Sequence, residues 1–355
     1  MSRFFTSRLA ALTPYTPGEQ PKDQQYVKLN TNESPFPPSP AVLRAVSEQV
    51  PQLQLYSDPE STKLRGALAA CYGVSPRQVI VSNGSDEVLN FAFQAFGDED
   101  HPLVFPDITY GFYPVFAQLN RIPYTTIPLR EDFSIGVEDY LGIGKTIVIA
   151  NPNAPTGLCL SIEEIEQILA SNRDNVVIID EAYVDFGAES AVALVDKYDN
   201  LLVTMTFSKS RSMAGARLGF AIGSESLIAD LNTIRYSTNP YNVNRMTETA
   251  GAASLEENDY YMANCRTIME NRSWTTGELE KLGFTVIPSK TNFIFAAHPQ
   301  LEGGELYRKL KERGILIRHF TASRIRNYNR ITIGTRQQME LLVAAIAKIK
   351  EEAAL

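Results

Sequence analysis

Residues 201–219 read LLVTMTFSKSRSMAGARLG, an apolar run followed by a polar segment that contains lysine and arginine. Comparable Val/Ile-rich runs occur upstream, and segments with a helical spacing of apolar residues lie between them. The apolar runs are Val79–Ser82, Leu103–Phe105, Thr146–Ala150, Val176–Ile179 and Leu201–Met205, and the helical segments are Thr62–Tyr72, Glu87–Phe96 and Ile162–Ala170. Continuous apolar runs between helices are typical of strands buried on both faces. The sequence therefore predicts an α/β fold with a mainly parallel sheet flanked by helices.

The pattern changes beyond about residue 240. A long helical stretch is predicted over 243–282, followed by strand-like pieces and a terminal helix; the pieces are Phe284–Ile287, Phe293–Phe295, Ile315–Ile317 and Ile331–Ile333. This order indicates a smaller α+β domain. The first 45 residues are rich in Pro but also contain aromatic side chains, which favours an ordered arm over a disordered tail. We expect an arm with part of the small domain over 1–45, a large domain over 46–242 and a small domain over 243–355.

Composition limits the classes of partner. The 355 residues have a formal net charge of −8, which disfavours binding to nucleic acid. No apolar run approaches the roughly 18 residues of a membrane span, and no leader pattern is visible, so a cytoplasmic protein without a membrane partner is expected. The three cysteines and three histidines lack the spacing of metal ligands, so no metal is expected and the cysteines are predicted to be buried core residues.

Lys209 follows directly after the run Leu201–Met205. Ligands bind at the carboxyl ends of strands in α/β sheets, although a lone lysine there could equally be an exposed loop residue. Ser208 precedes Lys209, and Arg217 follows in AGARLG. A hydroxyl and a guanidinium suit a phosphate dianion, and a desolvated lysine beside them can lose its proton and attack an aldehyde.

Asp180 ends another apolar run, in the sequence DEAY at 180–183. The residue could be an ordinary helix cap. Alternatively, a fixed carboxylate here could face a pyridinium nitrogen and keep that ring protonated, so that the ring accepts electrons. Tyr183 could then donate a hydrogen bond to a phenolic oxygen of the same ring.

Two loops complete the candidate site. Gly84-Ser85-Asp86 lies between an apolar run and a helical segment, and a helix N-terminus offers free N–H groups to phosphate, although an ordinary capped helix has the same sequence pattern. The loop NPNAPTG at 151–157 follows Thr146–Ala150, and its density of Pro and Gly is also typical of a plain turn. Its Asn side chains could reach the ring oxygen.

In order and spacing, these four segments resemble the fold-type-I pyridoxal-phosphate-dependent aminotransferases over nearly the whole chain. The strings LTPYTPGE (12–19), KLNTNESPFPPSP (28–40), LYSDP (55–59) and RITIGTR (330–336) are similar to the histidinol-phosphate aminotransferase branch. The resemblance implies transamination between L-histidinol phosphate and glutamate or 2-oxoglutarate, by a homodimer. An aromatic amino acid aminotransferase is the alternative with the same chemistry. A decarboxylase of a phosphorylated amino acid, a non-catalytic pyridoxal-phosphate-binding regulator and a scaffold without cofactor are further alternatives.

The resemblance also implies residue roles. Lys209 would hold pyridoxal 5′-phosphate as a Schiff base and move the proton, while Asp180 and Tyr183 would contact the ring nitrogen and ring oxygen. Tyr110 would stack on the ring. The phosphate would be held by backbone N–H groups of Gly84, Ser85 and Asp86, by Ser208 and Arg217, and by Tyr56 from a second subunit. The substrate would be bound by Arg330, Arg318 and Asn32, and by Tyr15 from the partner's arm.

One position departs from the family pattern. The family usually has Asn directly before Pro-Thr-Gly, where this chain has Ala154. We therefore expect Asn153 to make the contact to the ring oxygen if that contact is kept.

Overall fold

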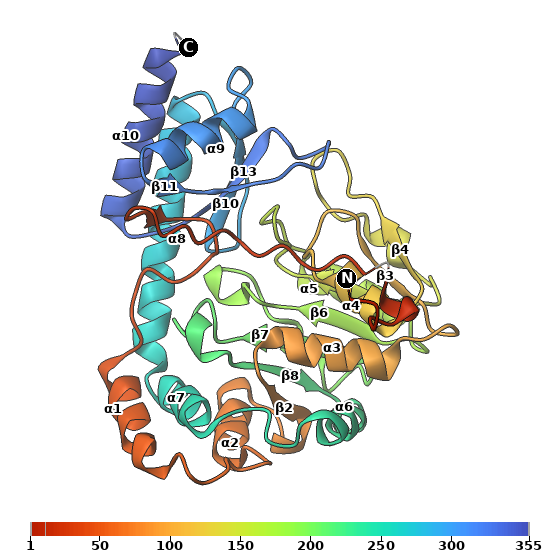
Figure 1. Ribbon diagram of the computed structural model, residues 1–355. Helices are drawn as coiled ribbons and strands as arrows, with labels where there is room; N and C mark the ends of the chain where they lie inside the picture. Colours follow the sequence, from red (N-terminus) through yellow and green to blue (C-terminus); the bar gives the residue numbers. More distant parts are fainter. Residues whose placement is uncertain (1, 11, 354–355) are drawn as a thin grey trace.

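The computed structural model describes residues 2–10 and 12–353. These residues form a seven-stranded sheet, in which β8 runs antiparallel to both of its neighbours while the other paired strands are parallel (Figure 1). Its spatial order is β2 (Val79–Ser82), β8 (Gly219–Gly223), β7 (Leu201–Thr206), β6 (Val177–Asp180), β5 (Thr146–Ala150), β3 (Leu103–Pro106) and β4 (Tyr124–Ile127). The predicted α/β class and mainly parallel sheet are confirmed.

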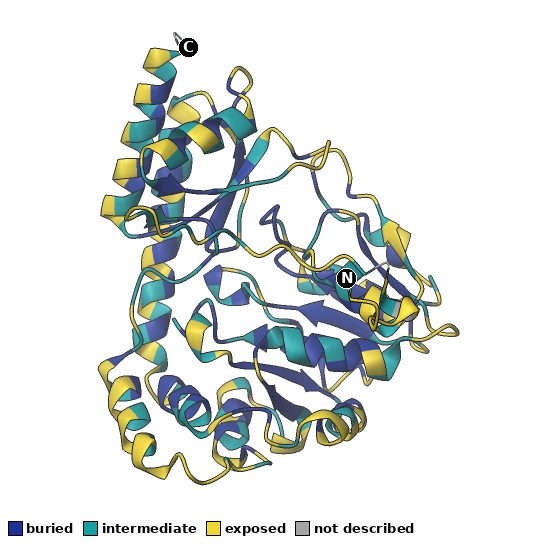
Figure 2. Cartoon of the chain, in the orientation of Figure 1, coloured by how far each residue is buried: buried dark blue, intermediate teal, exposed yellow. Residues whose placement is uncertain are grey.

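Both faces of this sheet are covered by helices, because successive strand side chains point to opposite sides. Ile147 and Ile149 of β5 belong to one apolar core, whereas Val148 belongs to the other. The first core is completed by α2 (Thr62–Tyr72), α5 (Ile162–Ser171) and α7 (Arg245–Glu256), and the second by α3 (Ser85–Phe96), α4 (Tyr113–Asn120) and α6 (Glu225–Thr238). Figure 2 shows the strands as buried and the outer helix faces as exposed.

Helix α5 illustrates how local sequence sets these elements. Ser161 caps the helix by accepting a hydrogen bond from the Glu164 backbone N–H, while the Glu164 side chain accepts from the Ser161 N–H. Ile165, Ile168 and Leu169 then lie on one helical face and are buried against the sheet. The cap and the apolar stripe together define where this helix begins and which side it buries.

A second sheet of the described chain has four antiparallel strands, in the order β12 (Arg318–His319), β13 (Tyr328–Thr332), β10 (Phe293–Ala297) and β9 (Thr285–Ile287). A third apolar core joins it to α8 (Asn258–Lys281), α9 (Gly303–Glu312) and α10 (Arg336–Glu352). Near it, β1 (Val27–Lys28) pairs in parallel with β11 (Ile315–Leu316), so the N-terminal segment joins the C-terminal part of the chain. Helix α1 (Pro40–Gln49) packs against α7. Short 3-10 helices cover Ser7–Leu9, Val50–Gln52, Pro76–Gln78, Val137–Tyr140, Val184–Phe186, Ala191–Leu194 and Ala214–Ala216.

The helical stretch predicted over 243–282 is two helices. Glu257 separates α7 from α8, and α7 packs on the large-sheet core. Tyr261 of α8 contacts that same core, whereas Ile268 lies in the core of the small sheet. Helix α8 therefore links the two parts (Figure 1).

The sequence analysis did not single out β4 or β8. Strand β4 lies at a sheet edge and exposes its Thr side chains, and β8 both begins and ends with glycine, so neither forms a long Val/Ile-rich run. The prediction of buried cysteines holds for Cys265 but is wrong for Cys71 and Cys159, which are exposed. Among the described helices, none combines the length and apolar character required to cross a bilayer.

Candidate active site

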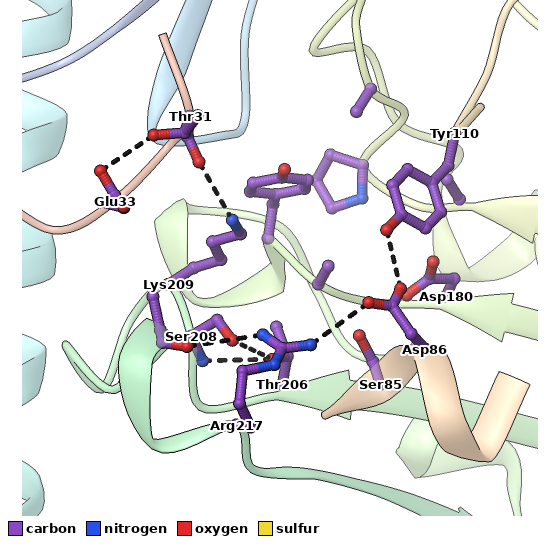
Figure 3. A pocket seen from close by; sticks show the side chains of 16 residues that line it. Thr31, Glu33, Ser85, Asp86, Tyr110, Asp180, Thr206, Ser208, Lys209 and Arg217 are labelled. Atoms are coloured by element: carbon purple, nitrogen blue, oxygen red, sulfur yellow. Dashed lines mark hydrogen bonds and ion pairs between the residues drawn. The ribbon is translucent and has the colours of Figure 1, made fainter. Parts of the chain in front are cut away.

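A cavity of about 260 Å³ opens at the carboxyl ends of the central parallel strands (Figure 3). Asp180 is the last residue of β6, and β7 ends at Thr206, just before Ser208 and Lys209. The cavity adjoins a second one of about 360 Å³, and Lys209 lines both. Parallel strand order thus brings Asp180 and Lys209, which are separated in the sequence, to one sheet edge.

Lys209 projects between the two cavities. Its Nζ donates a hydrogen bond of 3.3 Å to the backbone oxygen of Thr31 and lies 5.9 Å from the ring centroid of Tyr183. Glu33 also lines the first cavity, but its carboxylate accepts from Lys28 and Thr31. In the described part of the chain, Lys209 forms no ion pair, which leaves its amine available for chemistry.

Asp180 is a buried carboxylate with fixed orientation. Tyr113 Oη donates to one oxygen at 2.8 Å, and Thr204 Oγ1 donates to the other at 3.3 Å. Burial raises the pKa of Asp180 to about 6, although the bond from Tyr113 opposes the rise. No cationic side chain pairs with Asp180 among the residues described, so the site can accommodate a positively charged partner from a ligand.

Another part of the first cavity has groups that can bind an anion. Helix α3 begins after Gly84, whose φ of +82° favours glycine, and a Cβ at Gly84 would lie 2.5 Å from an Arg217 nitrogen. Arg217 can therefore pack directly over the helix N-terminus. Asp86 holds it there at 3.2 Å and also accepts a 2.7 Å hydrogen bond from Tyr110 Oη (Figure 3).

Gly84 itself is not a free donor. Its N–H donates to Ser82 O at 2.9 Å, so the prediction that it donates to phosphate is wrong. Ser85 and Asp86, the next two residues, line the cavity at the helix start, where N–H groups lack helical acceptors. Ser208 Oγ accepts a hydrogen bond of 2.9 Å from Thr206 Oγ1. A helix N-terminus, a hydroxyl and a guanidinium thus face one end of the cavity.

Arg330 and Arg318 line the second cavity. Arg330 on β13 donates from Nη2 to Asn30 O at 3.1 Å, and its guanidinium lies 5.3 Å from the Phe293 ring centroid. Its buried Nε has no partner among the described residues. Arg318 donates to Thr16 O at 3.5 Å. A half-buried guanidinium whose Nε is buried and which has no carboxylate partner in the described chain can bind an anion, because a partly desolvated cation gains free energy from pairing.

A family model described as aminotransferase class I and II matches residues 24–346. The chain belongs to this family. A histidinol-phosphate aminotransferase from Brachyspira hyodysenteriae is 48% identical, over 98% of this chain and 99% of that protein. One from Acinetobacter baumannii is 49% identical, over 97% and 96%. The solved histidinol-phosphate aminotransferase of Sinorhizobium meliloti, in complex with pyridoxal-5′-phosphate, shares the fold, with a TM-score of 0.85 at 24% identity over 93% of this chain and 92% of that one.

In this aminotransferase, the Asn153 prediction is wrong. Asn153 is buried, and its amide is occupied by Thr109 Oγ1, by Ile108 O and by Thr156 Oγ1, at 2.8 to 3.0 Å. It braces the loop, and Ala154 lines both cavities instead. Of the residues of this loop, the one that lines both cavities therefore offers only a methyl group as its side chain.

Two tyrosines were expected to reach a neighbour's site. Tyr15 lines the second cavity of its own chain, stacked 4.5 Å from Phe112, because the N-terminal arm folds back over that cavity. Tyr56 is 78% exposed and stacks on Tyr241, and it lines neither cavity of its own chain. Asn32 lines the second cavity beside Arg330, as expected for a substrate-binding residue, and Tyr110 lines both cavities.

The sequence analysis missed residues that orient the site. Tyr113 lies three residues after Tyr110 but was given no role by the sequence analysis, although its hydroxyl donates a hydrogen bond to Asp180. Thr204 is a polar residue inside an apolar strand, a signal that could have marked it as a partner of Asp180. Thr31 and Glu33 could not be placed beside Lys209 without the tertiary structure.

Proposed function

We propose that this protein transfers an amino group between L-histidinol phosphate and 2-oxoglutarate, giving imidazole acetol phosphate and L-glutamate in histidine biosynthesis. The observation that carries the proposal is Arg330, a half-buried guanidinium with no carboxylate partner in the described chain, which lines the same cavity as Lys209 and contacts the Asn30 oxygen, 300 residues away in the sequence. The near full-length relatives named histidinol-phosphate aminotransferase support the same reaction.

Pyridoxal 5′-phosphate fits the residues of the first cavity. Asp180 offers a buried carboxylate for a protonated ring nitrogen, and Arg217 with the α3 N-terminus offers an anion site for the phosphate. Tyr110 forms part of the cavity wall against which a flat ring can stack. When bound, the cofactor supplies an aldehyde that joins amines and a ring that accepts electrons.

Lys209 is the group that moves the proton. Its Nζ lies at the junction of the two cavities, where it can reach a substrate carbon held between them. Thr31 O holds the amine in place without neutralising it. A base in this position takes a proton from one carbon and returns it to another, while the surrounding side chains exclude water.

Arg330 and Arg318 would bind the anionic end of each substrate. Histidinol phosphate presents a phosphate, and glutamate presents a carboxylate, and a planar guanidinium can bind both. Phe293 and Phe320 pack on Arg330 and fix the plane of its guanidinium. The same arginines would therefore serve both half-reactions, giving ping-pong kinetics.

Steady-state assays test the proposal. The purified holoenzyme is given 2-oxoglutarate with histidinol phosphate, phenylalanine or tyrosine as amino donor, and kcat/KM is compared. We expect histidinol phosphate to exceed both aromatic donors. A higher kcat/KM for phenylalanine or tyrosine would instead assign the aromatic aminotransferase function.

Assembly and location complete the proposal: a cytoplasmic homodimer that acts on small molecules. Exposed apolar side chains gather on one stretch of the chain, namely Leu43, Val50, Leu53, Leu55 and Tyr56. A second copy covering this stretch would bring its Tyr56 to the phosphate end of the neighbouring cavity. The proposed division is an arm with part of the small domain over 1–45, a large cofactor-binding domain and a small C-terminal domain, with α8 crossing between the latter two.

A further inference from the structure

A short chain of hydrogen bonds connects β13 to Tyr183 through Asn32. The Asn32 backbone N–H donates to Thr332 Oγ1 at 3.0 Å, and Thr332 Oγ1 donates to Asn32 Oδ1 at 3.0 Å. Asn32 Nδ2 then donates to Tyr183 Oη at 2.9 Å. Asn32 and Thr332 are buried, with 1% and 3% of their surface exposed, so water does not compete for the two bonds between them.

The direction of these bonds is set by Thr332. Its oxygen accepts the Asn32 N–H, and its single hydrogen goes to the Asn32 side-chain oxygen, so the Asn32 NH₂ must face Tyr183. The Asn292 side chain donates to the Asn32 backbone oxygen and holds the residue at its positive φ of 57°. The Tyr183 oxygen therefore acts as an acceptor toward Asn32.

A phenol that accepts from an amide directs its own hydrogen elsewhere. Within residues 2–10 and 12–353, the Tyr183 hydroxyl donates to no protein acceptor, and Tyr183 lines both cavities. The other phenol of the first cavity, Tyr110, already donates to Asp86. On the loop of 151–157, the Ala154 side chain provides no donor. Tyr183 is thus the phenolic donor that remains for the ring oxygen of a bound cofactor.

We propose that Thr332 is a positioning residue that acts through Asn32 to make Tyr183 a hydrogen-bond donor to the cofactor's phenolic oxygen, in place of the amide that Ala154 lacks. The inference rests on the proposed function, because it requires pyridoxal phosphate in the first cavity. The same strand carries Arg330, so one strand would orient both the substrate anion and the ring-oxygen donor.

If Tyr183 donates this hydrogen bond, the pKa of the bound pyridoxal phosphate, which is the chromophore, should be lower than it would be without the bond. A hydrogen bond donated to the phenolic oxygen favours its anionic form, so losing the donor should raise the pKa read from the near-visible absorbance of the holoenzyme. The charged groups that face Tyr183 are Lys209, 5.9 Å above its ring, Arg330, and Asp180 across the first cavity. All three remain in the variants used to test the proposal.

The test is a pH titration of that absorbance in the holoenzyme. Tyr183→Phe should raise the chromophore pKa by about one pH unit, and Thr332→Val should raise it in the same direction by a smaller amount. Thr332→Ser keeps the hydroxyl and should titrate like the wild type. The double variant Thr332→Val/Tyr183→Phe should match Tyr183→Phe alone, because the two changes break one path.

Asn32→Asp provides a second route if Thr332→Val fails to fold. The carboxylate would accept from Tyr183 and draw its hydrogen away from the cavity, and the same change in the Tyr183→Phe background corrects for the added charge. A raised pKa beyond that charge effect supports the proposal. An unchanged titration in Thr332→Val, or no excess shift in Asn32→Asp, overturns it. Wild-type protein that shows no near-visible band and no transamination would instead remove the proposed function.

Discussion

The two walls of the active site are built in different ways. One, the strand-end wall, consists of Asp180, Thr206, Ser208 and Lys209, which sit at or just after the ends of β6 and β7. The other, the arm wall, consists of Tyr15, Thr31, Asn32, Arg318 and Arg330, which come from the N-terminal segment and the small sheet. Adjacent parallel strands bring the first set together, whereas hydrogen bonds between residues 300 apart assemble the second.

The two walls are expected to have different roles, with the catalytic chemistry at the strand-end wall and substrate binding at the arm wall. The strand-end wall is backed by two apolar cores and holds its carboxylate by two hydrogen bonds. The arm wall depends on an irregular segment anchored at Glu19, which accepts from Tyr307 and Lys311 on α9. We therefore expect changes in the strand-end wall to alter turnover and changes in the arm wall to alter substrate binding.

The largest effect is expected at Lys209. Lys209→Ala removes the amine at the junction of the cavities, so turnover should fall by about 10³-fold or more. Steady-state kinetics with histidinol phosphate measure the loss. Lys63→Ala, at an exposed lysine of α2, is the matched control and should retain activity. Normal turnover in Lys209→Ala would end the assignment of the strand-end wall to chemistry.

The arm wall is tested at Arg330. Arg330→Ala should lower kcat/KM for both histidinol phosphate and glutamate by about 10²-fold, because each anion loses its half-buried cationic partner. Arg326→Ala, at an exposed position of the same region, should leave both values near those of the wild type. Unchanged KM values for both substrates in Arg330→Ala would show that recognition lies elsewhere.

The role of Asp180 can be tested by measuring the stability of the protein rather than its catalytic rate. Because burial raises its pKa to about 6, ionisation of Asp180 destabilises the cofactor-free fold, and stability is lost as pH rises from about 4 through 6. Asp180→Asn should therefore be more stable than the wild type at pH 8, by about 1–3 kcal/mol, and similar to it near pH 4. Urea denaturation of cofactor-free protein at the two pH values measures the difference.

Adding pyridoxal phosphate should make the wild type more stable than Asp180→Asn at pH 8. The reason is that only the wild type offers a carboxylate to the ring nitrogen, so it gains more stability from the bound cofactor. If the variant and wild type gain equal stability from the cofactor, Asp180 does not face the ring.

The smallest effect is expected at the arm's anchor. Glu19→Gln weakens a partly exposed ion pair with Lys311, so KM for histidinol phosphate should rise no more than about threefold while kcat stays constant. The rise should shrink in high salt, which already screens the pair. Glu305→Gln, which breaks a pair with Lys309 away from the arm, is the control. A fall in kcat for Glu19→Gln but not for Glu305→Gln would contradict the expectation that the arm wall affects substrate binding and not turnover.

The sequence predicted correctly those features that depend on residues close together in the chain. Runs such as Thr146–Ala150 are buried throughout, so their period and composition predict strands and the ends of those strands predict the site. It failed for Asn153, because no local pattern shows that Thr109 and Ile108 occupy its amide. Sequence also does not show the path of the irregular arm, which brings Tyr15 to the second cavity of its own chain.

The sequence by itself determined the α/β class, the order of the apolar strands and the residues at their carboxyl ends, because burial and hydrogen-bond periodicity act over a few residues. Only the packed fold shows that Thr332 contacts Asn32, that Tyr113 donates a hydrogen bond to Asp180, and that Arg330 has a buried Nε without a partner in the described chain. These contacts join segments far apart in the chain, so they exist only after the sheets and the arm have packed together.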